Sequence, residues 1–262
     1  MYELLYFLIA LISCVIGALG GIGGGIIIKP TVDLLGQYSL MNIGLLVSST
    51  VLAMTVVSVW KMRRHIMGVG LRLVGLIAIG SLIGGIFGGY IFNAISNYFK
   101  VDKYIGIIQT IVLIVVILAV VAIELFKKHL SQRAYRSPLV IIGIGTILGT
   151  VSSFLGIGGG PFNKPTIYLL LGLTAKGSTV ASLCIVFFSQ ASNVVRTLYL
   201  NGLEPFDLSV LPYMIAGAIL GGYLGGLIIN KVDERLYDKL FMGVLMVILA
   251  INFLNLYQYI AS

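Results

Sequence analysis

A ten-residue pattern of glycines, a lysine and a proline occurs twice in this chain, and it limits the possible folds more than any other feature. The pattern Gly-x-Gly-Gly-Gly-x-x-x-Lys-Pro spans Gly21–Pro30 and returns 135 residues later at Gly156–Pro165. Both copies interrupt long apolar stretches. In a membrane protein, matching Gly/Pro breaks in the two halves indicate a binding site between broken helices.

The composition predicts an all-α polytopic protein of the cell membrane. Hydrophobic residues make up 59% of the chain and charged residues 10%, with a mean hydropathy of +1.08. A soluble domain carries roughly 25% charged residues. The start lacks the basic region of a signal peptide, so we expect the first helix to be retained. The net charge of +8 comes largely from short basic runs between apolar segments, which indicates cytoplasmic loops rather than nucleic-acid binding.

The motifs that are missing argue against catalysis and cofactors. Ile26 and Pro161 stand where a G-x-G-x-x-G motif would need its third glycine, and the chain contains no P-loop pattern. Cys14 and Cys184 lie in apolar segments and are expected to be packing residues. With no acid/base or metal-ligand cluster visible in the sequence, we predict no enzyme, no metal and no cofactor.

We divide the chain into a first transmembrane repeat at 1–126, a basic cytoplasmic linker at 127–137 and a second transmembrane repeat at 138–262. Five apolar segments are expected in each half, at 4–20, 26–36, 41–60, 71–95 and 104–126, then 138–155, 161–173, 177–199, 208–229 and 240–257. The glycines of 80–89 match those of 217–226, and their G-x-x-x-G spacing predicts close helix packing. Together with a weaker Ser-Thr-Val match, these ordered matches indicate internal duplication.

Two topologies follow from how segments 26–36 and 161–173 are counted. Each is too short to cross a hydrocarbon core of ~30 Å. If each segment continues the preceding helix, each half has four crossings and the repeats are parallel. If each turns back as a half-helix, each half has five segments and the repeats are inverted. We favour the inverted alternative, because it gathers the loop Lys and Arg residues on one face, twelve against three. It places 61–70 and 127–137 in the cytoplasm and both termini outside.

The glycine runs and their lysines are the main candidates for a binding site. Glycines let the chain turn and leave N–H groups at the start of the next helix open to an anion. A lysine inside the membrane is functional by default, although Lys29 has a structural alternative in a pair with Asp33, four residues on. Position 168, which matches Asp33 in the second copy, is a tyrosine, so Lys164 has no such alternative.

Further polar residues complete the candidate site. Ser and Thr hydroxyls could donate to an oxyanion or simply bond back to their own helix. Gln190 and Asn193 share a polar stripe with Arg196, which we expect at the membrane interface. The predicted substrate-binding residues are Gly23, Gly24, Gly25, Lys29, Ser49, Thr50, Gly158, Gly159, Gly160, Asn163, Lys164, Ser178, Thr179, Gln190 and Asn193.

The duplicated motif resembles the TauE/SafE family of sulfite exporters, also called TSUP permeases. The resemblance rests on Gly21–Pro30, Gly156–Pro165 and the glycine-rich helices at 80–89 and 217–226, and chain length and the basic central loop extend it over nearly the whole chain. It implies a prokaryotic inner-membrane permease for small sulfur-containing anions such as sulfite or sulfonates. It does not separate one anion from another.

We therefore expect a secondary transporter of small anions that works by alternating access around the two broken hairpins. Its expected partners are the anion and the lipid bilayer, with a homo-oligomer left open and no nucleic acid. An anion-selective channel and a non-transporting membrane assembly or sensor protein remain the alternatives.

Overall fold

The computed structural model describes residues 2–99, 101–126, 129–228 and 234–261, and all regular structure in these ranges is helical. Met1 and Ser262, whose placement outside was predicted, and residues 127–128 of the predicted linker lie outside the described residues. The helices of the first half are α1 (Tyr2–Gly20), α2 (Gly25–Leu34), α3 (Leu40–Lys61), α4 (Arg63–Val69), α5 (Leu71–Phe99) and α6 (Asp102–Phe126). Those of the second half are α7 (Pro138–Leu155), α8 (Asn163–Leu171), α9 (Ala175–Asn201), α10 (Leu211–Ile228) and α11 (Glu234–Ala261).

The described helices match the predicted segments, except that α4 was not expected. Eight of them are long and apolar enough to cross a membrane, namely α1, α3, α5, α6, α7, α9, α10 and α11. Many apolar side chains remain exposed on their outer surfaces, including Leu4, Val115 and Phe253. Exposed apolar surface of this extent indicates contact with lipid. The prediction of an all-α polytopic membrane protein is confirmed.

Both short helices turn back toward the side from which the preceding helix came. The Tyr6 hydroxyl, at the start of α1, donates to Oε1 of Gln37, just after α2, over 2.8 Å. At the end of α8, the carbonyls of Leu169 and Leu170 accept hydrogen bonds from the backbone of the linker before α7, from Arg133 and Tyr135. The hairpins α1–α2 and α7–α8 are therefore re-entrant, as in the five-segment alternative.

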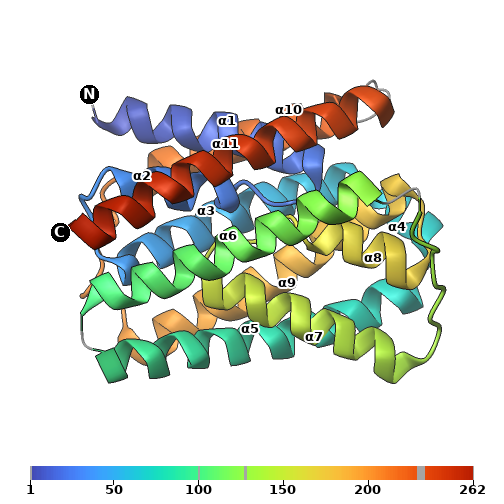
Figure 1. The fold of residues 1–262 in the computed structure, drawn as a ribbon, viewed down its shortest axis with the longest axis horizontal. Coiled ribbons are helices and arrows are strands. Elements are labelled where there is room, and N and C mark those ends of the chain that lie inside the picture. Colours follow the sequence, from blue (N-terminus) through green and yellow to red (C-terminus); the bar gives the residue numbers. More distant parts are fainter. Residues whose placement is uncertain (1, 100, 127–128, 229–233, 262) are drawn as a thin grey trace.

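Figure 1 shows the consequence for the whole chain. Both ends of the chain lie at one end of the helix bundle, while α4 and the linker before α7 lie at the opposite end. This arrangement is the one expected of inverted halves. Which end faces the cytoplasm, and the internal duplication itself, remain predictions.

The glycine-rich helices pack closely across the two halves, as predicted. On α5, Cβ atoms added at Gly80, Gly84 and Gly88 would run into backbone carbonyls of α7. On α10, Cβ atoms added at Gly217, Gly221 and Gly225 would lie against α1 in the same way. The second row of glycines, Gly85 and Gly89 on α5 and Gly222 and Gly226 on α10, faces α9 and α3 respectively. The same contacts therefore recur in both halves with the packing partners exchanged.

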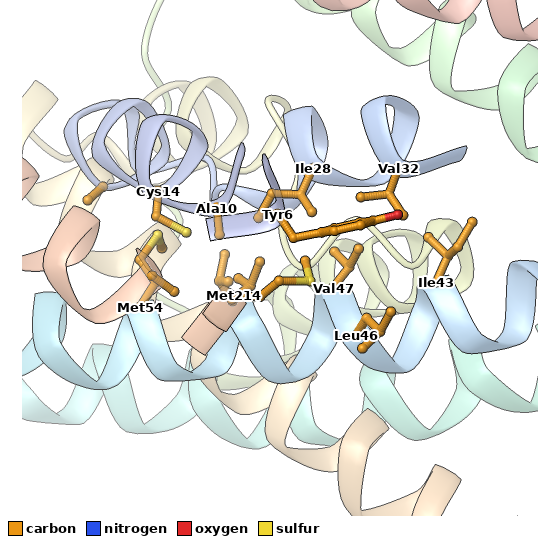
Figure 2. Close-up of a cluster of buried hydrophobic side chains, with 14 of the residues drawn as sticks. Tyr6, Ala10, Cys14, Ile28, Val32, Ile43, Leu46, Val47, Met54 and Met214 are labelled. Carbon is orange, nitrogen blue, oxygen red and sulfur yellow. The ribbon is translucent and has the colours of Figure 1, made fainter. Parts of the chain in front are cut away.

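The largest buried cluster holds the first hairpin on α3. Figure 2 shows Tyr6, Ala10 and Cys14 of α1 with side chains of α2 and α3, and each of these three has 0% exposure. The other labelled members are Ile28, Val32, Ile43, Leu46, Val47, Met54 and Met214. Cys14 and Cys184 are both free and buried, which confirms their expected packing role. The hairpin thus rests on an apolar base that fixes its position.

The orientation in the membrane can be tested by cysteine labelling. In a chain carrying Cys14→Ala and Cys184→Ala, we expect an impermeant thiol reagent applied to intact cells to label Glu204→Cys, in the loop between α9 and α10. Met67→Cys and Gln132→Cys, at the opposite end of the bundle, should react only after the membrane is permeabilised. All three positions are exposed. Labelling of 67 and 132 with protection of 204 would reverse the predicted orientation.

Candidate functional site at the crossing of the two hairpins

The tips of the two broken hairpins meet backbone to backbone. Gly23, Gly158 and Gly159 all have positive φ, at 76°, 62° and 130°, a backbone region that favours glycine. A Cβ at Gly23 would overlap the carbonyl oxygen of Gly158, and one at Gly25 would overlap that of Ile157. A Cβ at Gly159 would lie 2.7 Å from the carbonyl oxygen of Ile22. In this conformation each turn therefore fills the space beside the other.

Gly24 and Gly160 pack within their own halves of the chain. A Cβ on Gly24 would lie 2.8 Å from Sγ of Cys14, and one on Gly160 would overlap the ring of Phe162. The predicted glycines thus share a role in letting the chain pass close to other groups. Their use as anion ligands stays a prediction.

Lys29 reaches from α2 to the C-terminal end of α7, next to the turn of the other hairpin. Its side chain is 6% exposed, and Nζ donates hydrogen bonds to Oε1 of Gln109 on α6, over 2.6 Å, and to the carbonyl of Leu155. Gln109 also donates to the carbonyl of Phe154 over 2.6 Å. The C-terminal carbonyls of α7, the negative end of its dipole, are thus held by a cation and an amide. These bonds use two of the three N–H groups of the ammonium.

A cavity lies beside Lys29, on the side of the hairpin crossing nearer the chain ends. It contains about 400 Å³ of empty space, part of it open to the surface. We call it the hairpin cavity, and its walls come from the start of α3, the ends of α5, α7 and α9, and α6. It is lined by Lys29, Leu40, Met41, Gly44, Leu45, Phe92, Asn93, Gln109, Ser153, Phe154, Gly156, Asn193, Arg196 and Thr197.

A polar network on α9 forms one wall of the hairpin cavity. Nδ2 of Asn193 donates to Oγ of Ser48 over 3.0 Å, and Nη2 of Arg196 donates to Oδ1 of Asn193 over 3.3 Å and to Oγ1 of Thr197 over 3.5 Å. Arg196 was predicted at the membrane interface; its side chain is only 9% exposed, so it is buried in the protein, while its depth in the membrane stays a prediction. The end of α5 covers it, with Gly89 against the guanidinium.

A second, smaller cavity lies on the other side of Lys29, with about 280 Å³ of empty space. Its walls come from α2, α6, α11 and the end of α7. Here Nδ2 of Asn255 donates to the carbonyl of Pro30 over 3.0 Å, and the Tyr259 hydroxyl donates to Oδ1 of Asp33 over 2.6 Å. Lys29 and Gln109 line both cavities and therefore stand between them.

The structure does not gather all of the predicted site residues in one place. Lys164 is 7% exposed, its ammonium lies 5.9 Å from the centroid of the Phe241 ring, and it lines neither cavity. Thr50 and Thr179 donate to carbonyls of their own helices, the alternative raised for such residues. Asn193 and Lys29 thus lie in the hairpin cavity, while Lys164, Thr50 and Thr179 lie apart from it.

Four further candidates also lie outside the lining of the two cavities. Ser49 is half-buried on α3, beside the Ser48 that binds Asn193. Asn163, Ser178 and Gln190 are each 0% exposed. Among the described residues, both amide atoms of Asn163, Oγ of Ser178 and Oε1 of Gln190 find no hydrogen-bond partner. Their role in binding stays a prediction.

Sequence reasoning missed Ser48, Gln109 and the burial of Arg196. Gln109 carried a readable signal, because it is an uncharged polar side chain in an otherwise strongly apolar segment. Ser48 carried none, since three neighbouring Ser and Thr residues in one helix look alike. Within the described part of the chain, no three His, Cys, Asp or Glu side chains lie close enough together to hold a metal ion.

The fold and the site describe a multi-pass membrane protein with a cation-lined cavity between two re-entrant hairpins. Residues 6–253 match the model of the family described as sulfite exporter TauE/SafE, and the chain belongs to this family. It is 27% identical over 260 residues to the probable membrane transporter protein YunE of Bacillus subtilis (strain 168), covering 90% of this chain and 91% of that protein. No solved structure matches the chain significantly. The protein is a multi-pass transporter located in the cell membrane.

Proposed function

We propose that the protein is a secondary transporter of small anions, sulfur oxyanions such as sulfite or organosulfonates, that works by alternating access around the two hairpins. The observation that carries this proposal is the placement of Lys29, a buried cation, at a cavity beside the hairpin crossing. The description of the family as sulfite exporters supports the choice of a sulfur oxyanion.

The charge of the hairpin cavity favours an anion. Among the described residues that line it, Lys29 and Arg196 are charged, and the same lining holds no Asp or Glu. Asp33, which interacts with Lys29, lines the second cavity instead. A cation removed from water in a membrane is costly unless an opposite charge or water compensates it. A bound anion would supply that compensation, and would do so inside a low-dielectric surrounding where attraction is strong.

The hairpin crossing supplies the moving part. The two turns pass each other backbone to backbone at their glycines, and apolar side chains of both hairpins, including Ile22 and Ile157, pack in one buried cluster around them. The proposed movement is a shift of one hairpin against the other across this contact. In the proposed cycle, such a shift closes the hairpin cavity and opens an equivalent space on the opposite side. In this second conformation, the proposal has the glycine N–H groups and Lys164 exposed to the anion.

Counterflow in proteoliposomes tests this proposal against its alternatives. We expect vesicles loaded with unlabelled sulfite to take up labelled sulfite faster than empty vesicles, with a rate that saturates as the outer concentration rises. A channel would show neither trans-stimulation nor saturation of this kind, and a non-transporting assembly or sensor protein would move nothing. Protein-free vesicles of the same lipid are the control, and uptake equal to theirs for sulfite and for alkanesulfonates would contradict the proposal.

A further inference from the structure

Arg196 is a buried cation whose hydrogen-bonding groups are only partly used. Its side chain is 9% exposed, and its hydrogen bonds, to Asn193 and Thr197, both come from Nη2. Among the described residues, Nε and Nη1 find no partner. A buried charged group without its hydrogen bonds is strongly unfavourable, so these two atoms call for a partner that the described residues do not provide.

The surroundings of Arg196 hold the guanidinium in place without neutralising it. Gly89 of α5 leaves room for the head group, since a Cβ there would overlap Nε. The ring of Tyr90 lies 5.7 Å from the guanidinium carbon, which is within reach of a cation–π contact. The neighbours that contact the head group are thus polar or aromatic, and Arg196 lines the hairpin cavity together with Lys29.

We propose that Arg196 binds the anion and makes the hairpin cavity selective for doubly charged oxyanions. This inference rests on the proposed function, because it assigns the substrate class of the same cavity. A guanidinium offers parallel N–H groups that match two oxygens of an oxyanion, whereas the Lys29 ammonium acts as a compact point charge. Two cations facing one cavity are matched by a dianion such as sulfate, thiosulfate or the fully ionised form of sulfite, whereas a monoanion matches only one of them. The carboxylate of Asp33, which also interacts with Lys29, lines the second cavity and not this one.

Thermal unfolding of the purified full-length protein tests this selectivity, because a ligand that binds only the folded state raises its apparent stability. We expect sulfate and thiosulfate to stabilise the wild-type protein at concentrations at least tenfold lower than methanesulfonate or nitrate, at matched ionic strength. Arg196→Gln should weaken dianion binding by about tenfold to a hundredfold, the loss of one charge-assisted contact, and remove the preference. Arg196→Lys should keep part of the preference.

The control is Arg72→Gln, an exposed arginine at the start of α5, at the opposite end of the bundle, which should leave all four anion affinities unchanged. Should Arg196→Gln not fold, Gly89→Ala offers a second route, because its methyl group displaces the guanidinium while keeping its charge and favouring the helix. Gly89→Ala should then reduce the dianion preference.

Each outcome decides one proposal. A wild-type protein that binds anions with no preference for dianions, or an Arg196→Gln or Gly89→Ala variant that keeps the wild-type preference, would overturn the role of Arg196 and leave the proposed function standing. A wild-type protein that neither binds nor moves any anion would overturn the proposed function itself. A variant with lowered stability but unchanged anion preference would show that Arg196 is purely structural.

Discussion

Gly25→Ala is expected to abolish transport, because the added methyl group would overlap the carbonyl oxygen of Ile157 in the other hairpin. The added methyl group is fixed to the backbone of Gly25, and the oxygen it meets belongs to the backbone of Ile157. Neither group can turn away as a flexible side chain would. Overpacking of a buried site costs about 1–3 kcal/mol or more, and here it separates the two turns. We expect membrane insertion to persist, since the apolar helices are unchanged, with transport lost and the thermal unfolding temperature clearly lowered.

Gly143→Ala in α7 is the matched control, because a Cβ there meets nothing within 4 Å. It should transport like the wild type and be equally or slightly more stable, since alanine favours a helix over glycine. The same comparison can be made from the second hairpin with Gly159→Val, where the positive φ adds backbone strain. Wild-type transport by Gly25→Ala at equal expression would show that the crossing is not the functional element.

Lys29→Met is expected to remove sulfite-induced stabilisation and transport together. The change takes a buried cation from the hairpin cavity and leaves the Leu155 carbonyl and Gln109 Oε1 without their donor. The loss of one charge-assisted hydrogen bond corresponds to about 1.5–3 kcal/mol, or roughly tenfold to a hundredfold weaker binding. Thermal unfolding in a sulfite titration measures the binding, and counterflow measures the transport.

Two further variants separate charge from structure. The single change Lys29→Met removes the cation that lies one turn before the Asp33 carboxylate on α2. The double variant, Lys29→Met with Asp33→Leu, removes this carboxylate as well. If this double variant folds, binds and transports like the wild type, Lys29 and Asp33 are a structural pair and Lys29 does not bind the anion. Lys164→Met should keep sulfite binding in the hairpin cavity while slowing transport, because Lys164 lies beside Phe241 rather than in the cavity. Equal loss of binding in Lys164→Met would restore the symmetric two-lysine site predicted from the sequence.

The sequence by itself determined the class of protein, the approximate positions of all the described helices except α4, and the positions of the two breaks. These features depend on local properties: apolar length decides which segments suit a membrane, and glycine and proline decide where a helix can end. The G-x-x-x-G spacing of Gly80, Gly84 and Gly88 likewise predicted close packing, because one helix face carries all three. Loop charges favoured the re-entrant hairpins, a choice that the Tyr6–Gln37 side-chain hydrogen bond and the backbone bond from Arg133 to Leu169 bear out.

Only the tertiary structure decided which polar residues share a cavity. Lys29 meets Gln109 and Leu155, which lie 80 and 126 residues away in the chain, and no local pattern encodes such a meeting. The sequence placed Arg196 near the end of a long helix but did not show that Gly89 lets the end of α5 cover its guanidinium. Lys29 and Lys164 hold the same position in the duplicated motif, yet in the fold the first contacts a glutamine and the second lies near a phenylalanine ring. Their chemistry is set by neighbours that the crossing of the hairpins brings to them.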